Sequence, residues 1–373
     1  MWDRLVGYCM TYHAGIIGAG GIAGLGILGL HDEADIGKKK FDASHAGGYH
    51  AAPDIELRCV ADRDAEKLAT FGTAWDLSPE RRYTNHRTML GTESLDVISV
   101  CTPSLFHRDH VIDAVRIADP SVVWCEKPIA TSVADAEAMM AACEETDTTL
   151  VINHSLRFDE KHRQLRRLIQ ADDLLGDIHS VTAQFRMELL RNSTHVLDLL
   201  EFLLGTRPKH VSGHVTGANE AVESLGADIS VEDAGGGGFV VQEDGTFVTV
   251  DCTIPRRSSS MMLSIVGDGG KLYLNNDDGE WRYWRLEDGT HSEQPLEGLD
   301  GTWSWTEDYR DAFPAAARHV QGLLNGEVEN RSPPEPATRA LATIVGLFLS
   351  ADTAGQVELP LSPAMKGVTI NSW

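Results

Sequence analysis

HAGIIGAGGIA, residues 13–23, is a short apolar run that ends in clustered glycines. This pattern is typical of a buried parallel strand that enters a tight turn and then a helix. Within it, residues 18–23 fit G-x-G-x-x-A, in which the first glycine permits the turn, the second lets the backbone approach a pyrophosphate, and the alanine allows close helix packing. A bare match is often only a tight turn, so the flanking sequence decides between the two readings. The candidate residues of this turn are Gly18, Gly20, Gly21, Ile22 and Ala23.

Apolar runs of strand length recur beyond this turn, and amphipathic stretches of helix length separate most of them. Alternating strands and helices predict a parallel sheet that is covered by helices on both faces. We therefore expect an α/β, doubly wound Rossmann domain at residues 10–152 that binds a dinucleotide, with the phosphates at the N-terminus of the first helix. Its further strands are expected at Glu56–Ala61, Asp96–Cys101, Ser121–Cys125 and Thr148–Ile152.

After residue 152 the pattern changes to alternating segments joined by glycine-containing turns. Three hairpins in series are predicted, so residues 153–373 should form an α+β domain with an open, mostly antiparallel sheet. Two late helices are expected to pack on one face of that sheet. The hairpin turns lie at residues 243–245, 268–269 and 287–289, and the expected helices span residues 161–170, 195–204, 312–324 and 336–354.

Asp62 is the candidate for the acidic residue that closes the second strand and binds the ribose hydroxyls of a dinucleotide. It follows Gly18 by 44 residues, whereas the usual spacing is about 20. The excess falls in residues 31–53, which are too polar and glycine-rich to continue a helix and are therefore predicted to be an inserted loop. The lysines at 38–40 could touch phosphate, although a solvated charge run is the commoner explanation.

The composition restricts the partners of this 373-residue chain. Its 32 Lys and Arg against 56 Asp and Glu leave a net charge of −24, which argues against nucleic acid and anionic membranes as partners. Arginine supplies 23 of the cations and lysine only 9. A self-repelling acidic surface is tolerable where molar salt screens it, so we expect a halophilic, cytoplasmic protein. Neither a membrane span nor an export signal is expected.

Ordered motifs carry a specific resemblance. Glu126-Lys127-Pro128 ends a strand at the carboxyl edge of the predicted parallel sheet, where such folds bind ligands. Together with the other motifs, it occurs in the order seen in the Gfo/Idh/MocA oxidoreductases, which the chain resembles over nearly its whole length. The other motifs are Gly18-x-Gly20-x-x-Ala23, Val60-Ala61-Asp62, Cys101-Thr102-Pro103-Ser104 with His107, Arg157-Phe158 and His195-x-x-Asp198.

This resemblance implies an NAD(P)-dependent dehydrogenase that acts on the CH–OH groups of sugars, polyols or their derivatives. Lys127 matches the catalytic lysine, and a partly desolvated lysine has a depressed pKa that suits it to exchange a proton with a hydroxyl. The alternative is a lysine that merely binds the ribose or a carboxylate. The candidate cofactor-binding residues are the five of the turn, Asp62, Arg63, Thr102, Pro103, His107, Glu126 and Lys127, with Thr102 and Pro103 flanking the nicotinamide and Glu126 contacting its ribose.

His195 and Asp198 lie one helical turn apart, so His195 can face the substrate while Asp198 anchors the helix or the imidazole. The family commonly places an acid four residues before this histidine, and here that position is Arg191, with Asn192 next. Either Asn192 substitutes, or Arg191 binds an anionic substrate group, or the proton relay differs. The candidate substrate-binding residues are Lys127, His154, Arg157, Arg191, Asn192 and His195, and Arg157 is equally a structural ion-pair residue.

Asp62 favours NAD over NADP because its carboxylate repels a 2′-phosphate, although Arg63 beside it could bind that phosphate. No metal site is expected, because the histidines are scattered. An uncovered sheet face predicts a homodimer or homotetramer through residues 239–273. Two alternative functions remain on the same fold: a sensor that binds nucleotide and sugar without turnover, and a glycosidase that uses tightly held NAD for a transient oxidation.

Overall fold

The computed structural model describes residues 11–26, 43–216, 230–255, 261–305 and 307–372. The N-terminal domain is built on a six-stranded sheet with the order β3-β2-β1-β4-β5-β6, and every pair of neighbours in it is parallel. The predicted strands are confirmed as β1 Tyr12–Ile17, β2 Ile55–Ala61, β4 Val97–Val100, β5 Val122–Cys125 and β6 Thr149–Ile152. The short strand β3 Arg82–Tyr83 was not predicted.

The strand order reverses between β1 and β4, and this is the switch point at which doubly wound sheets bind ligands. Side chains of both sheet faces are buried, which is why the strands read as continuous apolar runs. The helices around this sheet are α1 His45–Ala51, α2 Ala65–Ala74, α3 His86–Thr92, α4 His107–Ala118 and α5 Val133–Glu145, with short helical turns η1 Gly21–Leu25, η3 Pro79–Arg81 and η4 Ser104–Phe106.

The predicted loop over residues 31–53 is wrong in its last part, because α1 occupies residues 45–51 and lies in the core. Ser44 caps this helix by accepting a hydrogen bond from the Gly47 amide at 3.0 Å. A Cβ on Gly48 would lie 2.9 Å from the carbonyl oxygen of Phe313, so glycine here allows two helices to approach closely. The remainder, residues 31–42, lies outside the described residues, and the lysines at 38–40 with it.

The C-terminal domain contains a nine-stranded sheet with the order β15-β14-β13-β12-β7-β11-β10-β8-β16. Only the β7–β11 pair is parallel in this sheet, and the predicted hairpins are confirmed as β10–β11, β12–β13 and β14–β15. The strands are β7 Ile178–Arg186, β8 Pro208–Thr216, β10 Gly235–Gln242, β11 Phe247–Ile254, β12 Met261–Gly267, β13 Gly270–Asn275, β14 Glu280–Glu287, β15 Thr290–Gln294 and β16 Val357–Glu358.

A separate two-stranded ribbon pairs β9 (Ser230–Glu232) with β17 (Thr369–Asn371), so the end of the chain returns to the junction of the domains. The Ile370 amide donates to the carbonyl oxygen of Thr131 in the N-terminal domain at 2.9 Å. The helices of this half of the chain are η5 Ser155–Arg157, α6 Glu160–Gln170, η6 Leu189–Ser193, α7 Thr194–Leu204, α8 Asp308–Leu324 and α9 Pro334–Thr353.

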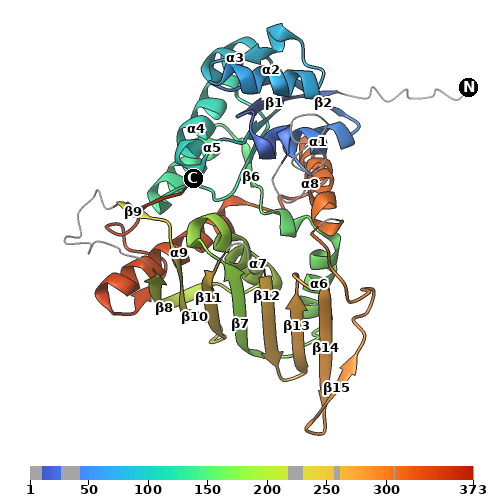
Figure 1. Cartoon of the computed structure of the whole chain (residues 1–373), viewed down its shortest axis with the longest axis vertical. Coiled ribbons are helices and arrows are strands. Elements are labelled where there is room, and N and C mark those ends of the chain that lie inside the picture. The colour runs from blue at the N-terminus through green and yellow to red at the C-terminus, as the bar shows by residue number, and fades with distance from the viewer. Residues whose placement is uncertain (1–10, 27–42, 217–229, 256–260, 306, 373) are drawn as a thin grey trace, which may run out of the picture.

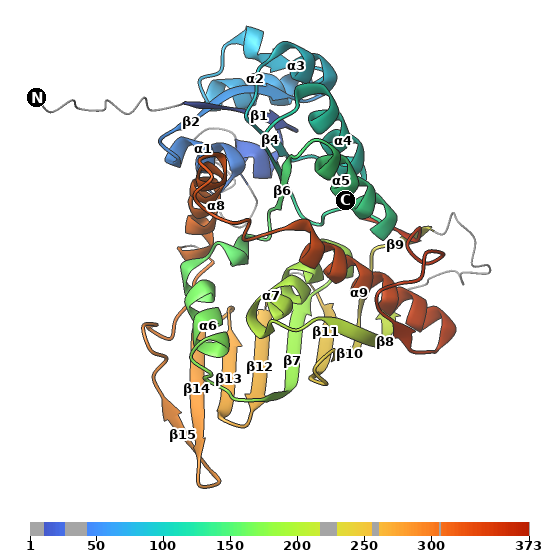
Figure 2. The same cartoon turned by 180° about the vertical axis from the view of Figure 1, so that it is seen from behind.

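The expectation that both late helices pack on the large sheet is wrong for α8. Figures 1 and 2 show α8 beside α1 in the upper domain, while α6, α7 and α9 lie on one face of the large sheet. Phe313 and Val320 of α8 belong to the same buried cluster as Trp124 of β5. The other face of the large sheet is covered by no helix within the described ranges, and Phe239, Phe247 and Val266 are 49%, 42% and 39% exposed.

Candidate active site

The glycine turn after β1 has the geometry that a dinucleotide requires. Gly18 has φ +99°, and a Cβ there would lie 2.9 Å from the carbonyl group of Cys101, so only glycine fits. A Cβ on Gly20 would meet nothing within 4 Å, so the space above the turn is open. Gly21 and Ile22 follow in η1, and Ala23 is fully buried, as close packing there demands.

Asp62 lies at this turn despite its distance in sequence, because β1 and β2 are neighbouring parallel strands. Its Oδ2 accepts a hydrogen bond from the Ala19 amide at 2.8 Å, and its Oδ1 accepts one from the Asp64 amide at 2.9 Å. The open space above Gly20 and the carboxylate at the end of β2 fit the pyrophosphate and the adenosine ribose of NAD. Arg63, next in the chain, lies with its guanidinium 5.8 Å from the Phe106 ring centre.

The loop of Thr102 and Pro103 begins at the end of β4 and faces the same edge of the sheet. His107 lies beneath it and is 1% exposed, with its Nε2 2.8 Å from the Thr102 carbonyl oxygen and its Nδ1 2.9 Å from that of Pro128. Burial lowers the pKa of His107. The His107 ring therefore contacts both the loop after β4 and the loop after β5 and holds them together.

Glu126 is buried among groups that sequence reasoning did not identify. Its Oε1 accepts a hydrogen bond from Asn153 Nδ2 at 2.5 Å and lies 3.0 Å from His45 Nε2, and its Oε2 accepts one from the Lys127 amide at 3.3 Å. Burial alone would raise the pKa of Glu126, but the hydrogen bond and charge of His45, together with Lys127 and Asn153, lower it. The carboxylate is thus held ionised beside Lys127. The other ring nitrogen of His45, Nδ1, lies 2.8 Å from Ser99 Oγ.

Lys127 lies at the centre of the site. Its Nζ donates a hydrogen bond to the carbonyl oxygen of Arg191 at 3.0 Å. Burial, together with the charges of Arg186 and Arg191, lowers the pKa of Lys127 to about 8 against the opposing charge of Glu126. A lysine in this state can both accept and return a proton near neutral pH.

His195 lies close to Lys127, but Asp198 does not hold its imidazole. Burial and the charge of Lys127 keep the pKa of His195 well below 6.5, so the ring is neutral. Asp198 instead contacts His154 Nδ1 at 2.8 Å and Arg157 Nε at 2.7 Å. Of the two alternatives for Asp198, the contacts fit the first: Asp198 holds its own helix, α7, to the segment of His154 and Arg157 and does not contact the His195 imidazole. Of the roles proposed for Arg157, the ion pair is the one present.

Arg191 and Asn192 belong to η6, the short turn before α7. The amides of Leu190 and Arg191 both donate to Asp233, each at 2.9 Å, and Ser372 Oγ donates to the same carboxylate at 2.8 Å. Asn192 Nδ2 donates to the Met187 carbonyl oxygen at 2.6 Å, so its amide holds the turn. No motif in the sequence predicts that Asp233 holds this turn, because its partners include backbone groups far along the chain.

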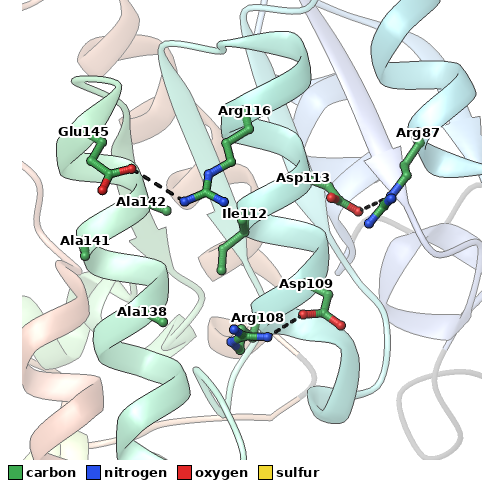
Figure 3. Close-up of a pocket in the computed structure, with 10 residues that line it drawn as sticks. All are labelled: Arg87, Arg108, Asp109, Ile112, Asp113, Arg116, Ala138, Ala141, Ala142 and Glu145. Carbon is green, nitrogen blue, oxygen red and sulfur yellow. Dashed lines mark hydrogen bonds and ion pairs between the residues drawn. The ribbon is translucent and has the colours of Figure 1, made fainter.

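A groove of about 510 Å³ lies elsewhere, between α4 and α5 (Figure 3). Its three arginines each face an acid: Arg87 and Asp113 lie 2.8 Å apart, Arg108 and Asp109 2.8 Å, and Arg116 and Glu145 3.6 Å. The charges in the groove are therefore matched, and none of its lining residues belongs to the site around Lys127.

Within the described ranges, no three His, Cys, Asp or Glu side chains are grouped so that they could hold a metal ion. None of the helices in the same ranges has the length and hydrophobicity that a membrane span requires.

Comparison with known proteins agrees with this geometry. Residues 12–154 match the family described as "Oxidoreductase family, NAD-binding Rossmann fold", GFO_IDH_MocA. D-apiose dehydrogenase of Paraburkholderia graminis is 26% identical over 87% of this chain and 88% of its own. D-xylose 1-dehydrogenase (NADP(+)) 2 of Haloferax volcanii is 25% identical over 90% and 99%.

A solved structure supports the fold across both domains. The WlbA dehydrogenase from Bordetella pertussis, in complex with NADH and UDP-GlcNAcA, superposes with a TM-score of 0.75 at 18% identity, covering 95% of this chain and 99% of that one. The predicted two-domain fold is confirmed by this likeness. Residues 12–154 are therefore an NAD-binding Rossmann domain that is similar to the domain of the Gfo/Idh/MocA oxidoreductases.

Proposed function

We propose that the protein is a dehydrogenase that transfers a hydride between NAD and a CH–OH group of a sugar, polyol or sugar derivative. The observation that carries this proposal is Lys127, an amine with a pKa near 8 at the carboxyl edge of the Rossmann sheet. The relatives named above support it, because they are dehydrogenases of the sugars apiose and xylose.

NAD, when bound, supplies the nicotinamide carbon that accepts or returns the hydride. The turn at Gly18 and Gly20 would hold the pyrophosphate, Asp62 the adenosine ribose, and the loop of Thr102 and Pro103 the nicotinamide end. During oxidation the neutral amine of Lys127 takes the hydroxyl proton while the C–H bond breaks as hydride. His195 orients the substrate or relays the proton.

A substrate screen tests this function. Sugars, sugar acids and inositols are offered in molar KCl with NAD and NADP separately, and the absorbance of the reduced cofactor is followed. Net reduction with any substrate supports the dehydrogenase. Binding of NAD and a sugar without any reduction would favour the sensor, and a cofactor retained through purification, with a glycosidic bond cleaved and no net reduction, would favour the glycosidase.

The cofactor preference is the first expected outcome. The Asp62 carboxylate lies at the glycine turn, so a 2′-phosphate would bring like charges together, and NAD should bind more tightly than NADP by about tenfold or more. Fluorescence titration of both reduced cofactors measures this ratio. A tenfold preference for NADP would show that Arg63 binds the phosphate and would overturn the assignment to Asp62.

The second expected outcome concerns the oligomeric state of the protein. The uncovered sheet face carries Phe239 and Phe247, with ring centres 5.1 Å apart, and an apolar face of this kind is stabilised when it meets its own copy. We expect light scattering in molar KCl to give at least twice 40.7 kDa. Phe247→Asp should yield the monomer, whereas Val328→Asp, equally 42% exposed but after α8, should not. A monomeric wild type would refute the interface.

The third expected outcome concerns the response of the protein's stability to salt. We propose that the protein works in a halophilic cytoplasm, because its net charge of −24 repels itself in dilute buffer. The melting temperature should therefore fall as KCl is lowered from molar to millimolar concentration. Sucrose of equal osmolarity is the control, since it adds no screening. An unchanged melting temperature would contradict the proposal.

A further inference from the structure

Arginine charge gathers around Lys127. Arg191 contributes the carbonyl oxygen that accepts the Lys127 hydrogen bond, so its residue lies directly beside the amine. Arg186 ends β7 with its guanidinium 5.9 Å from the Phe185 ring centre, and that ring lies 6.4 Å from His195. The positive charges of both arginines act on the Lys127 amine, because each of them lowers its pKa.

Three acids of this region already bind other groups. Glu126 binds His45 and Asn153, Asp198 binds His154 and Arg157, and Asp233 accepts two backbone amides and a serine hydroxyl. The Arg191 guanidinium itself forms no hydrogen bond or ion pair with any residue that the structure describes, although it is partly buried.

We propose that the substrate carries an oxyanion, a carboxylate or a phosphate, which Arg191 binds with the help of Arg186 while Lys127 exchanges the proton of a neighbouring hydroxyl. This inference rests on the proposed dehydrogenase function and names its substrate class. A guanidinium presents a planar pair of donors that matches the two oxygens of such a group. The same contact would fix which hydroxyl faces Lys127, so it serves orientation as well as affinity.

The test compares substrates that share a carbon skeleton and differ in charge. D-glucose, D-gluconate, D-glucuronate and D-glucose 6-phosphate, and the galactose counterparts of all four, are offered with NAD. We expect kcat/KM for an acid or phosphate to exceed that of its neutral sugar by about 10- to 100-fold, the range of one charged hydrogen-bonded contact. Preference between the carboxylate and phosphate probes tells which oxyanion the site takes.

Variants locate the effect. Arg191→Gln should raise KM for the charged substrate about tenfold or more relative to its effect on KM for the neutral sugar, with Arg191→Lys in between because it keeps charge but loses the paired donors. Arg108→Gln, in the groove of Figure 3, is the matched control and should change neither. Unaltered melting temperatures show that the variants fold. If Arg191→Gln does not fold, Arg186→Gln provides a second test.

The possible results distinguish the oxyanion proposal from the dehydrogenase function on which it rests. If neutral sugars are turned over as well as their acids, and Arg191→Gln alters neither, the oxyanion assignment fails while the dehydrogenase stands. If no member of the panel is oxidised or shifts the melting temperature of the NADH-bound enzyme, the oxyanion assignment fails. If, in addition, the wider substrate screen reduces no cofactor, the dehydrogenase fails with it.

Discussion

Lys127→Met is expected to slow turnover by about 10²- to 10⁴-fold, the range that a positioned acid or base contributes. Methionine keeps most of the bulk of the side chain and removes the group that exchanges the proton. NAD binding should persist, because Gly18, Gly20 and Asp62 are untouched. Lys67→Met, an exposed lysine on α2, is the control and should behave as wild type. Turnover of a confirmed substrate by Lys127→Met at near the wild-type rate would refute the mechanism.

The pH profile gives this prediction a second readout. Oxidation requires the neutral amine, and the pKa of Lys127 is lowered to about 8, so the wild-type rate should rise as pH increases through 8 and then level off. That limb should vanish or move in Lys127→Met. His195→Ala should cost less than Lys127→Met if the imidazole only orients the substrate, and a comparable amount if it relays the proton.

Asp198→Ala is expected to lower the free energy of unfolding by about 3–5 kcal/mol, because it leaves the buried Arg157 guanidinium without its counter-charge. The His154 ring loses its partner in the same step. Asp109→Ala, which removes an exposed carboxylate paired with Arg108, should cost about 1 kcal/mol or less. Urea denaturation in molar KCl measures both values, and equal effects would contradict this role of Asp198.

Acid should reproduce part of this loss. Burial alone would raise the pKa of Asp198, but the charges of Arg157 and His154 lower it from 3.8 to about 2 in the folded protein. A carboxyl with a lowered folded pKa stabilises the protein fully above its ordinary value, and that contribution is lost as pH falls through 3.8 toward 2. The difference in stability between wild type and Asp198→Ala should therefore shrink over this range.

Local patterns were sufficient for most of the fold. The apolar run with its glycine turn predicted β1 and the site of Gly18, and the alternation around residues 243–245 predicted the β10–β11 hairpin. They succeed because strand pleating and turn geometry are imposed by residues within a few positions of one another. The Glu126-Lys127 pair was likewise predicted at the carboxyl edge of the sheet, since parallel strands end along the same edge.

Partners across long distances were decided only by the tertiary structure. Helical spacing left open whether Asp198 anchors its helix or the His195 imidazole, and the fold decides for the helix by bringing Asp198 to His154 and Arg157, which lie on another segment. The glycines near residue 48 suggested a loop, whereas they allow α1 to pack against α8. The sequence by itself determined most strands of the Rossmann sheet, the three hairpins, the glycine turn and the position of Lys127. Periodicity reports that a side chain is buried but not what it meets, so the pairing of buried charges was settled by how distant segments pack together.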